Sequence, residues 1–382
     1  MELRPNLVWS RSASDFYLQH GEQLLPYITP PIDTEKLSEQ LGRMERFIRS
    51  YSRFTNAKNR ENEKKIFEAI LITFASPLMW MLRGVLSEER GREKLAEAPV
   101  ILILGGHANS GKSRLLLTLS KLCGNPFDVL SYKNINTKGQ RIIEDLMTSE
   151  ILFPLFVDEI EKSFFESSGG QELIKHLTNR PPTPSPCLIG TTNTEFAPRA
   201  EVVRRISYLH FTDTFPLGDP QARKEADRYL KEEVGILDET VFKYLLHQMV
   251  LRIREGDPLM GEDDPLGIAR QILKEAFSAH GISTDFISPG ALGDFYTTGR
   301  VDWHAFYRTN RKLFETIRVE AESCLAVDLD RIYGGYGKKA DHLKNRLPPD
   351  VVRSGGTPLV LRKEPFLAFI GHKEGLWEKL KG

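Results

Sequence analysis

A glycine-framed loop between two regular segments is the first feature whose residues could do chemistry. The apolar run of residues 100–104 leads into GGHANSGKS, and Gly106 to Ser113 fit the pattern G-x-x-x-x-G-K-[S/T]. The run before the loop is β-prone, and residues 114–122 after it have the spacing of an amphipathic helix. Glycines let the backbone wrap closely around a polyphosphate, and free amides at the helix start point at the anion. The loop therefore predicts a nucleotide site.

Two side chains of this loop have distinct expected tasks. Lys112 supplies a positive charge for the β and γ phosphates, and the hydroxyl of Ser113 can ligate Mg²⁺. We expect His107 to be an exposed spacer. The expected nucleotide contacts are the residues of the loop and the one that follows it: Gly106, His107, Ala108, Asn109, Ser110, Gly111, Lys112, Ser113 and Arg114.

A second hydrophobic run, ILFPLFVDEIEK, ends in a pair of carboxylates, Asp158 and Glu159. Ligands of α/β sheets bind outside the carboxyl ends of the strands, where these side chains would project. We expect Asp158 to hold Mg²⁺, directly or through water, and Glu159 to polarise the attacking water as a general base. The alternative is a solvated acidic pair at a strand end. The phosphate loop upstream favours the catalytic interpretation.

Polar residues after the next two strand-like runs complete the candidate site. The run PCLIGTTN ends at Asn193, whose amide can orient the same water, although asparagine is also common in ordinary turns. Arg204 and Arg205 lie just before the run ISYLHF. A guanidinium is always charged and forks onto phosphate oxygens, so one of the two could act on the γ phosphate of a neighbouring subunit. The alternative is a pair that caps a helix or faces solvent. Arg199 is a weaker candidate.

The composition of the chain sets limits on its class. The 382 residues carry 52 Lys plus Arg and 52 Asp plus Glu, so a basic binding surface must be local. Three cysteines without motif spacing fit neither a disulfide framework nor a zinc site and indicate a cytoplasmic location. The most apolar run, 69–86, is interrupted by proline and arginine, which favours a buried core helix over a membrane span.

The pattern along the chain predicts an α/β fold with flanking helical regions. We expect residues 1–95 to be mostly helical, 96–216 to form the parallel-sheet core, 217–330 to be helical, and 331–382 to form a small module like a winged helix. In that module, a helix is expected at 341–346 and β runs around RKEP. The expected core strands are 100–104, 151–157, 187–191 and 206–211.

The order of these motifs resembles that of the AAA+ ATPases. GHANSGKS corresponds to Walker A, LFPLFVDEIE to Walker B, IGTTN to sensor 1, and VVRRISYLHF to the arginine-finger segment. Within that family, the chain is most similar to the superfamily-three helicases and related phage, plasmid and viral ATPases. The resemblance implies an AAA+ P-loop core, a homo-oligomeric ring such as a hexamer, and Mg²⁺-dependent hydrolysis of ATP at subunit interfaces. It gives Lys112, Asp158, Glu159 and Asn193 the tasks described above, and Arg204 or Arg205 the task of reaching a neighbour's site.

The chain departs from those helicases where they carry a basic pore hairpin. The corresponding stretch, HLTNRPPTPSPC, is short and rich in proline, with Arg180 as one of two residues that offer charge. The loop LSYKNINTKGQR is the better pore candidate: Lys133, Lys138 and Arg141 could meet phosphates, and Tyr132 could stack on a base. A solvated loop is the alternative. Arg270 is a candidate for a sensor-2 arginine.

Two functions fit these observations. One is an ATP-driven DNA helicase or translocase of phage, plasmid or defence type, supported by the loop lysines and the basic C-terminal segments. The other is a regulatory or scaffolding ATPase whose ring gates an effector protein such as a nuclease. A P-loop kinase of small molecules is less favoured, because it needs no Walker B glutamate, sensor asparagine and arginine pair in this order. Neither function involves a membrane.

Overall fold

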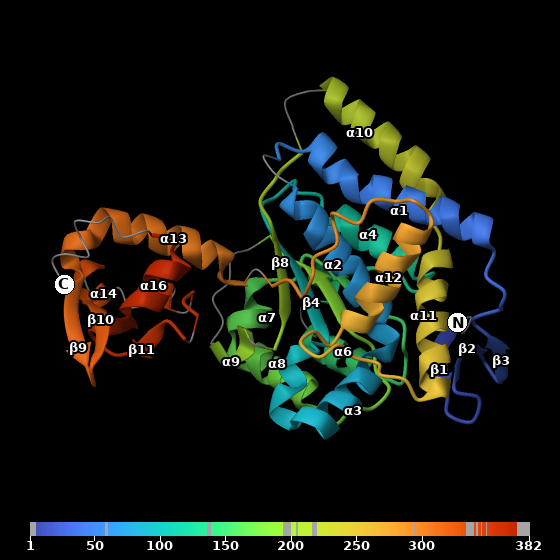
Figure 1. Ribbon diagram of the computed structural model, residues 1–382, viewed down its shortest axis with the longest axis horizontal. Coiled ribbons are helices and arrows are strands. Elements are labelled where there is room, and N and C mark those ends of the chain that lie inside the picture. The colour runs from blue at the N-terminus through green and yellow to red at the C-terminus, as the bar shows by residue number, and fades with distance from the viewer. Residues whose placement is uncertain are drawn as a thin grey trace. The chain divides into compact units, whose positions relative to one another are not determined.

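The computed structural model describes most of the chain as two compact units. The first unit comprises Met1–Phe196 and Arg204–Gly293, and the second comprises Ala197–Val203 and Asp294–Gly382 (Figure 1). Within them the structure describes residues 5–57, 60–135, 139–193, 200–203, 205–215, 220–293, 295–333, 340, 343–344, 346–348 and 350–372. The expected boundaries near 95, 216 and 330 do not coincide with the limits of these units. The described residues before 95 and those of 220–293 belong to the first unit, and the second unit takes in the stretch from 294 to 330.

The N-terminal region begins with strands rather than helices. β1 (Asn6–Ser10), β2 (Asp15–His20) and β3 (Gln23–Pro26) form an antiparallel sheet in that order. Leu7 and Phe16 are fully buried on one face of it. The expectation of a mostly helical region holds from Thr34 onward, but the sequence analysis did not predict these three strands. They are short, and their period-2 pattern is easily missed beside the long helical pattern that follows.

Three helices follow and supply most of the first unit's apolar interior. α1 (Thr34–Phe54) starts at Asp33, whose carboxylate accepts the amides of Glu35 and Lys36 at 2.9 and 3.1 Å. α2 (Glu61–Ala75) and α3 (Met79–Arg90) are joined by the 3₁₀ turn η1 (Ser76–Leu78), which contains Pro77. The 3₁₀ helix η2 (Arg92–Glu97) then leads to the core sheet.

The stretch Glu61–Arg90 is long and apolar enough, by length and composition, to cross a membrane. In the structure 78% of its most apolar window is buried inside the protein. α2 packs against α1, α4 (Lys112–Leu122), α11 (Thr240–Glu255), α12 (Gly267–Ala279) and β8 (Ser207–Phe211). This packing favours the core-helix interpretation of the apolar run.

The core of the first unit is the expected parallel sheet. Its strand order is β5 (Leu130–Ser131), β6 (Leu155–Asp158), β7 (Leu188–Thr191), β4 (Ile101–Gly106) and β8 (Ser207–Phe211). All four strands expected from the sequence are present, and β5 is an additional two-residue edge strand. β7 lies between β4 and β6, so the phosphate loop, Asn193 and the acidic pair follow three adjacent strands.

Helices cover and connect the strands of this sheet. They are α4 (Lys112–Leu122), α5 (Tyr132–Ile135), α6 (Gly139–Met147), α7 (Lys162–Glu166) and α8 (Ser168–Asn179). The short helix α9 (Ala200–Val203) belongs to the second unit. After β8 come α10 (Pro220–Glu233), the 3₁₀ turn η4 (Val234–Ile236), α11 (Thr240–Glu255) and α12 (Gly267–Ala279). α4 packs on β6 and β7, and α10 packs on α1.

The second unit has its own sheet and core. It contains α13 (Phe295–Asn310), the 3₁₀ turn η5 (Arg311–Leu313), β9 (Glu315–Val319), β10 (Glu322–Val327), α14 (Leu329–Ile332), β11 (Val352–Ser354), β12 (Leu359–Arg362) and α16 (Lys363–Phe369). The strands form an antiparallel sheet in the order β11-β12-β10-β9 around a core in which Trp303 meets Phe366 edge to face.

Two expectations for this C-terminal region are wrong in detail. Strands β9 and β10 fall inside the segment expected to be helical, and the expected second β run after RKEP is the helix α16. Of the helix expected at 341–346, the structure describes Leu343 and Lys344 as helical, together with the turn residue Arg346. The remaining residues of that segment lie outside the described part.

Candidate nucleotide site

The phosphate loop joins β4 to α4 in a backbone shape that its glycines make possible. Gly106 and Gly111 have φ angles of 126° and 81°, in the left-handed region. A Cβ at Gly106 would lie 2.0 Å from the carbonyl oxygen of Phe211, and one at Gly111 would lie 2.7 Å from the Phe215 ring. Both positions therefore exclude any larger side chain. His107 is exposed, as expected for a spacer.

Lys112 lies folded back over the loop that it belongs to. Its Nζ donates to the carbonyl oxygens of Gly106 and His107 at 3.1 and 2.5 Å and to Ser110 Oγ at 3.1 Å. Burial lowers the pKa of Lys112 to about 8, against an opposing effect of the Asp158 charge. The three groups that accept its hydrogen bonds are neutral, so they do not balance the positive charge of the Lys112 ammonium. A bound phosphate would supply that charge.

The carboxylate of Asp158 is fixed at the end of β6. Its Oδ1 accepts hydrogen bonds from Ser113 Oγ at 3.0 Å, from the Glu159 amide at 3.1 Å, and from the Thr191 hydroxyl. The hydroxyl of Ser113 and this carboxylate are hard oxygen donors in contact with each other. That set fits Mg²⁺, which takes one or two protein oxygens and completes its shell with phosphates and water.

Among the residues that the structure describes, no group of three or more histidine, cysteine, aspartate or glutamate side chains is placed to hold a metal. A site of one hydroxyl and one carboxylate therefore depends on the nucleotide phosphates for its remaining ligands.

Glu159 is turned toward the edge strand of the sheet. Its backbone φ is 57°, and its amide donates to Thr191 Oγ1 at 2.9 Å. The Glu159 carboxylate lies 2.7 Å from the ammonium of Lys133 on α5, and this ion pair raises the pKa of Lys133. The carboxylate expected to act as the base is therefore neutralised by a neighbouring lysine in this structure.

Asn193 lies two residues beyond β7, and its side chain is exposed. The position of β7 between β4 and β6 puts this residue at the same sheet edge as Lys112 and Asp158. A residue that orients the attacking water, as expected of Asn193, would have to lie at this edge.

Of the three candidate finger arginines, the structure describes Arg205. Arg199 and Arg204 lie outside the described residues. Arg205 donates to the side chains of Asn179 and Thr178 at the C-terminal end of α8, the latter at 3.4 Å. Cations are favourable at this end of a helix. Arg205 thus lies against a helix end, as in the alternative that the sequence analysis kept.

Two of the residues expected to contact nucleic acid have partners within the protein. Lys133 is paired with Glu159, and Arg180 donates to the Met147 carbonyl at 2.9 Å. The expectation that Tyr132 stacks on a base is wrong, because its side chain is buried against Phe164. Arg141 is exposed, and Lys138 lies outside the described residues.

Arg270, the sensor-2 candidate, belongs to a buried ion-pair network. It donates to both carboxylate oxygens of Glu68 at 2.6 and 3.0 Å and lies 2.8 Å from Asp264. Burial raises the pKa of Glu68, while Arg270 opposes that rise. Because these two carboxylates occupy the guanidinium, Arg270 joins α12 to α2 and does not face the phosphate loop.

The sequence analysis missed two residues that shape the site. Thr191 orients Asp158 and Glu159, and its place at the end of the run IGTT was the available signal. Tyr51 donates its hydroxyl to the Gly111 carbonyl at 2.9 Å from α1, far away in sequence. No local pattern links Tyr51 to the loop.

Comparison with known proteins agrees with this geometry. A family model described as the Aq_aa27 P-loop NTPase domain matches residues 13–196. The match contains the loop, the acidic pair and Asn193, and ends before Arg204. No curated protein matches the chain. The parallel sheet, the loop and the match together identify a P-loop NTPase domain.

Proposed function

We propose that this protein is an ATPase of the AAA+ type, which assembles with copies of itself and hydrolyses ATP at the subunit interfaces. The observation that carries the proposal is the insertion of β7 between β4 and β6. It brings a sensor position next to the phosphate loop and the acidic pair, in the motif order that resembles AAA+ ATPases.

Each residue of the site has a task in this reaction. Lys112 leaves the loop carbonyls and binds the β and γ phosphates, while Ser113 and Asp158 hold Mg²⁺. When bound, Mg²⁺ neutralises the charge that develops on the phosphate oxygens. Glu159 takes the proton of the attacking water after it separates from Lys133. Asn193 orients that water, and an arginine of a neighbouring subunit completes the site.

Of the two cellular roles considered from the sequence, the regulatory or scaffolding role now has more support. In the loop that could grip DNA, the Tyr132 side chain is in the protein interior, and the exposed Lys133 is paired with Glu159. A DNA translocase needs these groups at the pore. A ring that recruits or gates an effector protein does not.

The test of the proposal is turnover by the purified protein with Mg²⁺. We expect ATP hydrolysis that EDTA abolishes, and ATP-dependent assembly measured by light scattering. Glu159→Gln should still bind nucleotide but lose about 10²-fold or more in kcat. Glu172→Gln on the exposed face of α8 is the matched control. Near-normal turnover in Glu159→Gln, or full turnover by a strict monomer, contradicts the proposal.

The same assay separates the two roles. A several-fold stimulation by single-stranded DNA would favour the translocase. Absence of stimulation, together with assembly driven by ATP, would favour the regulatory ATPase.

A further inference from the structure

A cleft of about 220 Å³ lies directly beside the phosphate loop. Its walls come from three separate parts of the chain. α1 contributes Tyr51 and Phe54, the loop contributes Gly111, and the segment after β8 contributes Phe215 and the α10 residue Leu230. Part of this lining lies beyond residue 196, outside the region that the family model matches.

Two of the aromatic residues are fastened to the loop by hydrogen bonds. Tyr51 donates its hydroxyl to the Gly111 carbonyl at 2.9 Å, and burial raises the pKa of Tyr51, so the proton stays on the oxygen. The amide of Phe215 donates to the Asn109 carbonyl at 3.0 Å. The two rings lie edge to face, 5.6 Å apart. The cleft therefore keeps a fixed position relative to the phosphate site.

The opposite wall, α10, is held against α1 by polar contacts. Glu233 lies 3.2 Å from Arg43 and 2.9 Å from Arg46, and the Tyr229 hydroxyl donates to the Arg46 carbonyl at 2.7 Å. The rings of Phe54 and Phe215 are half-buried, so both present an apolar face to the cleft. Three charged residues also contribute to the lining: Arg114, Arg223 and Asp227.

The chemistry of this cleft matches one end of a nucleotide. A nucleoside triphosphate has a flat ring system at the end opposite its phosphates, and aromatic side chains bind such rings by stacking. We propose that the cleft receives the nucleobase, and that it selects purines over pyrimidines because the larger ring system covers more of the aromatic walls. This inference rests on the proposed nucleotide site and adds the residues that set its substrate class.

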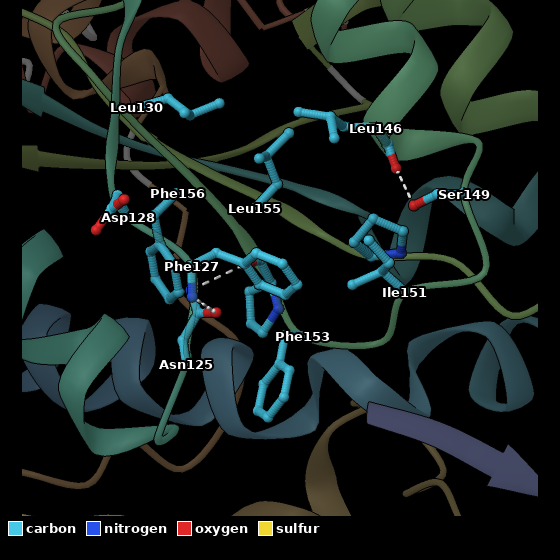
Figure 2. Close-up of a pocket in the computed structure, with 12 residues that line it drawn as sticks. Asn125, Phe127, Asp128, Leu130, Leu146, Ser149, Ile151, Phe153, Leu155 and Phe156 are labelled. Carbon is cyan, nitrogen blue, oxygen red and sulfur yellow. Dashed lines mark hydrogen bonds between the residues drawn. The ribbon is translucent and has the colours of Figure 1, made fainter. Parts of the chain in front are cut away.

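A second cavity provides a contrast within the same unit. It has a volume of about 250 Å³ and is lined mostly by apolar residues around the start of β6, among them Phe127, Phe153 and Phe156 (Figure 2). None of the phosphate-loop residues lines it. Phe127 is half-buried like the two cleft phenylalanines, so it serves as the matched control.

The experiment compares nucleotides with inorganic tripolyphosphate, which has the phosphates but no base. Dissociation constants for ATP, GTP, CTP, UTP and tripolyphosphate are measured for the full chain and for Phe54→Ala, Phe215→Ala and Phe127→Ala. We expect the wild-type protein to bind both purine nucleotides more tightly than both pyrimidine nucleotides. Each cleft variant should lose about tenfold or more in ATP affinity, keep its affinity for tripolyphosphate, and lose most of the purine preference. Phe127→Ala should change none of these values.

Two outcomes overturn the inference while leaving the proposed function intact. One is unchanged ATP affinity in both cleft variants. The other is an equal loss for ATP and tripolyphosphate, which would mean that the rings only shape the loop. If thermal unfolding shows that an alanine variant has lost its fold, the corresponding leucine variant replaces it. The preference of the wild-type protein for purine over pyrimidine nucleotides tests the inference without any variant. Failure of the wild-type protein to bind any of these anions would instead contradict the nucleotide site itself.

Discussion

The ammonium of Lys133 and the carboxylate of Glu159 form an ion pair of 2.7 Å across the edge of the parallel sheet. Both side chains are substantially exposed, at 66% and 40%. Exposed ion pairs are weak, because water screens the attraction and both side chains lose freedom. The ion pair therefore neutralises the charge of the candidate base, and a bound nucleotide or a partner could break it at little cost in free energy.

Lys133→Ala is expected to raise the basal rate of ATP hydrolysis. Without the lysine, Glu159 no longer has to leave an ion pair before it accepts a proton from water. Since an exposed pair is easily broken, the increase in kcat should be about two- to fivefold. Steady-state turnover at saturating Mg²⁺ and ATP measures it. Lys94→Ala, which removes a similarly exposed ion pair with Glu97, is the control.

A fall in kcat for Lys133→Ala would contradict this interpretation, since it would make Lys133 part of the active arrangement. The same variant addresses the DNA question. If wild-type turnover rises with DNA and that rise disappears in Lys133→Ala, the lysine contacts DNA as the sequence analysis first suggested.

Binding of ATP should weaken as pH rises above about 8. Burial lowers the pKa of Lys112 from 10.5 to about 8, so above that pH the unliganded lysine is neutral. Phosphate binds the charged form, and each further pH unit should then cost about tenfold in affinity until the pKa of the bound state is reached. Titration of the ATP dissociation constant from pH 7 to 9.5 measures this, with proton uptake followed by calorimetry in two buffers.

Lys112→Arg is the control for this pH dependence. Arginine stays charged throughout the range, so its ATP affinity should be lower but independent of pH. The free energy of unfolding changes with pH in the opposite direction to ATP affinity. Between pH 8 and 10.5 the unfolded chain holds the proton of Lys112 and the unliganded folded chain does not, so this group makes the free energy of unfolding rise with pH. A flat binding profile for the wild-type protein would contradict the position of Lys112 in the phosphate site.

The predictable part of the fold has strong local signals. The loop pattern and the apolar runs of β4, β6, β7 and β8 identify a parallel sheet, because fully buried strands appear as continuous apolar segments. The order of the strands, with β7 between β4 and β6, comes from the structure. β5 has two residues, and the hairpins of β1 to β3 are short, so neither gives a periodic signal long enough to recognise.

The predictable part of the site is the set of residues next to strand ends. Lys112, Ser113 and Asp158 follow from local patterns, and the structure brings them together. The partners of these residues do not follow from the sequence. Whether a lysine faces DNA or a carboxylate depends on which loop packs beside it, as Lys133 shows. The partner of Arg270 is equally hidden from local patterns, because Glu68 lies on α2, far away in the sequence.

Thr191→Val should weaken the dependence of turnover on Mg²⁺. The Thr191 hydroxyl donates to Asp158 and accepts the amide of Glu159, so it holds both acidic residues in place. Valine has the same shape without the hydroxyl. Loss of a residue that orients a metal ligand costs about 10- to 100-fold in metal affinity, and the Mg²⁺ concentration for half-maximal turnover should rise accordingly. Thr73→Val, a buried threonine bonded to its own helix, is the control. An unchanged Mg²⁺ profile would show that Asp158 does not need this contact.

Arg204→Ala and Arg205→Ala should have different effects. Arg205 binds the C-terminal end of α8, where Arg83 also donates to the Thr178 carbonyl at 2.5 Å. Its loss should lower the thermal unfolding temperature of the protein at any concentration. Arg204→Ala should retain this stability and ATP binding but lose cooperative turnover, because we expect Arg204 to act on the neighbouring subunit.

Mixed assemblies distinguish an arginine that acts between subunits from one that acts within its own. Arg204→Ala subunits keep Glu159, and Glu159→Gln subunits keep Arg204, so interfaces formed between the two variants regain one intact site. We therefore expect mixtures of the two inactive proteins to recover part of the wild-type turnover, and mixtures of Glu159→Gln with Lys112→Ala to recover none, because both changes damage the same subunit's phosphate site. Recovery with Arg205→Ala but not with Arg204→Ala would reverse the assignment, since Arg205 would then have to leave α8 whenever a neighbour binds ATP.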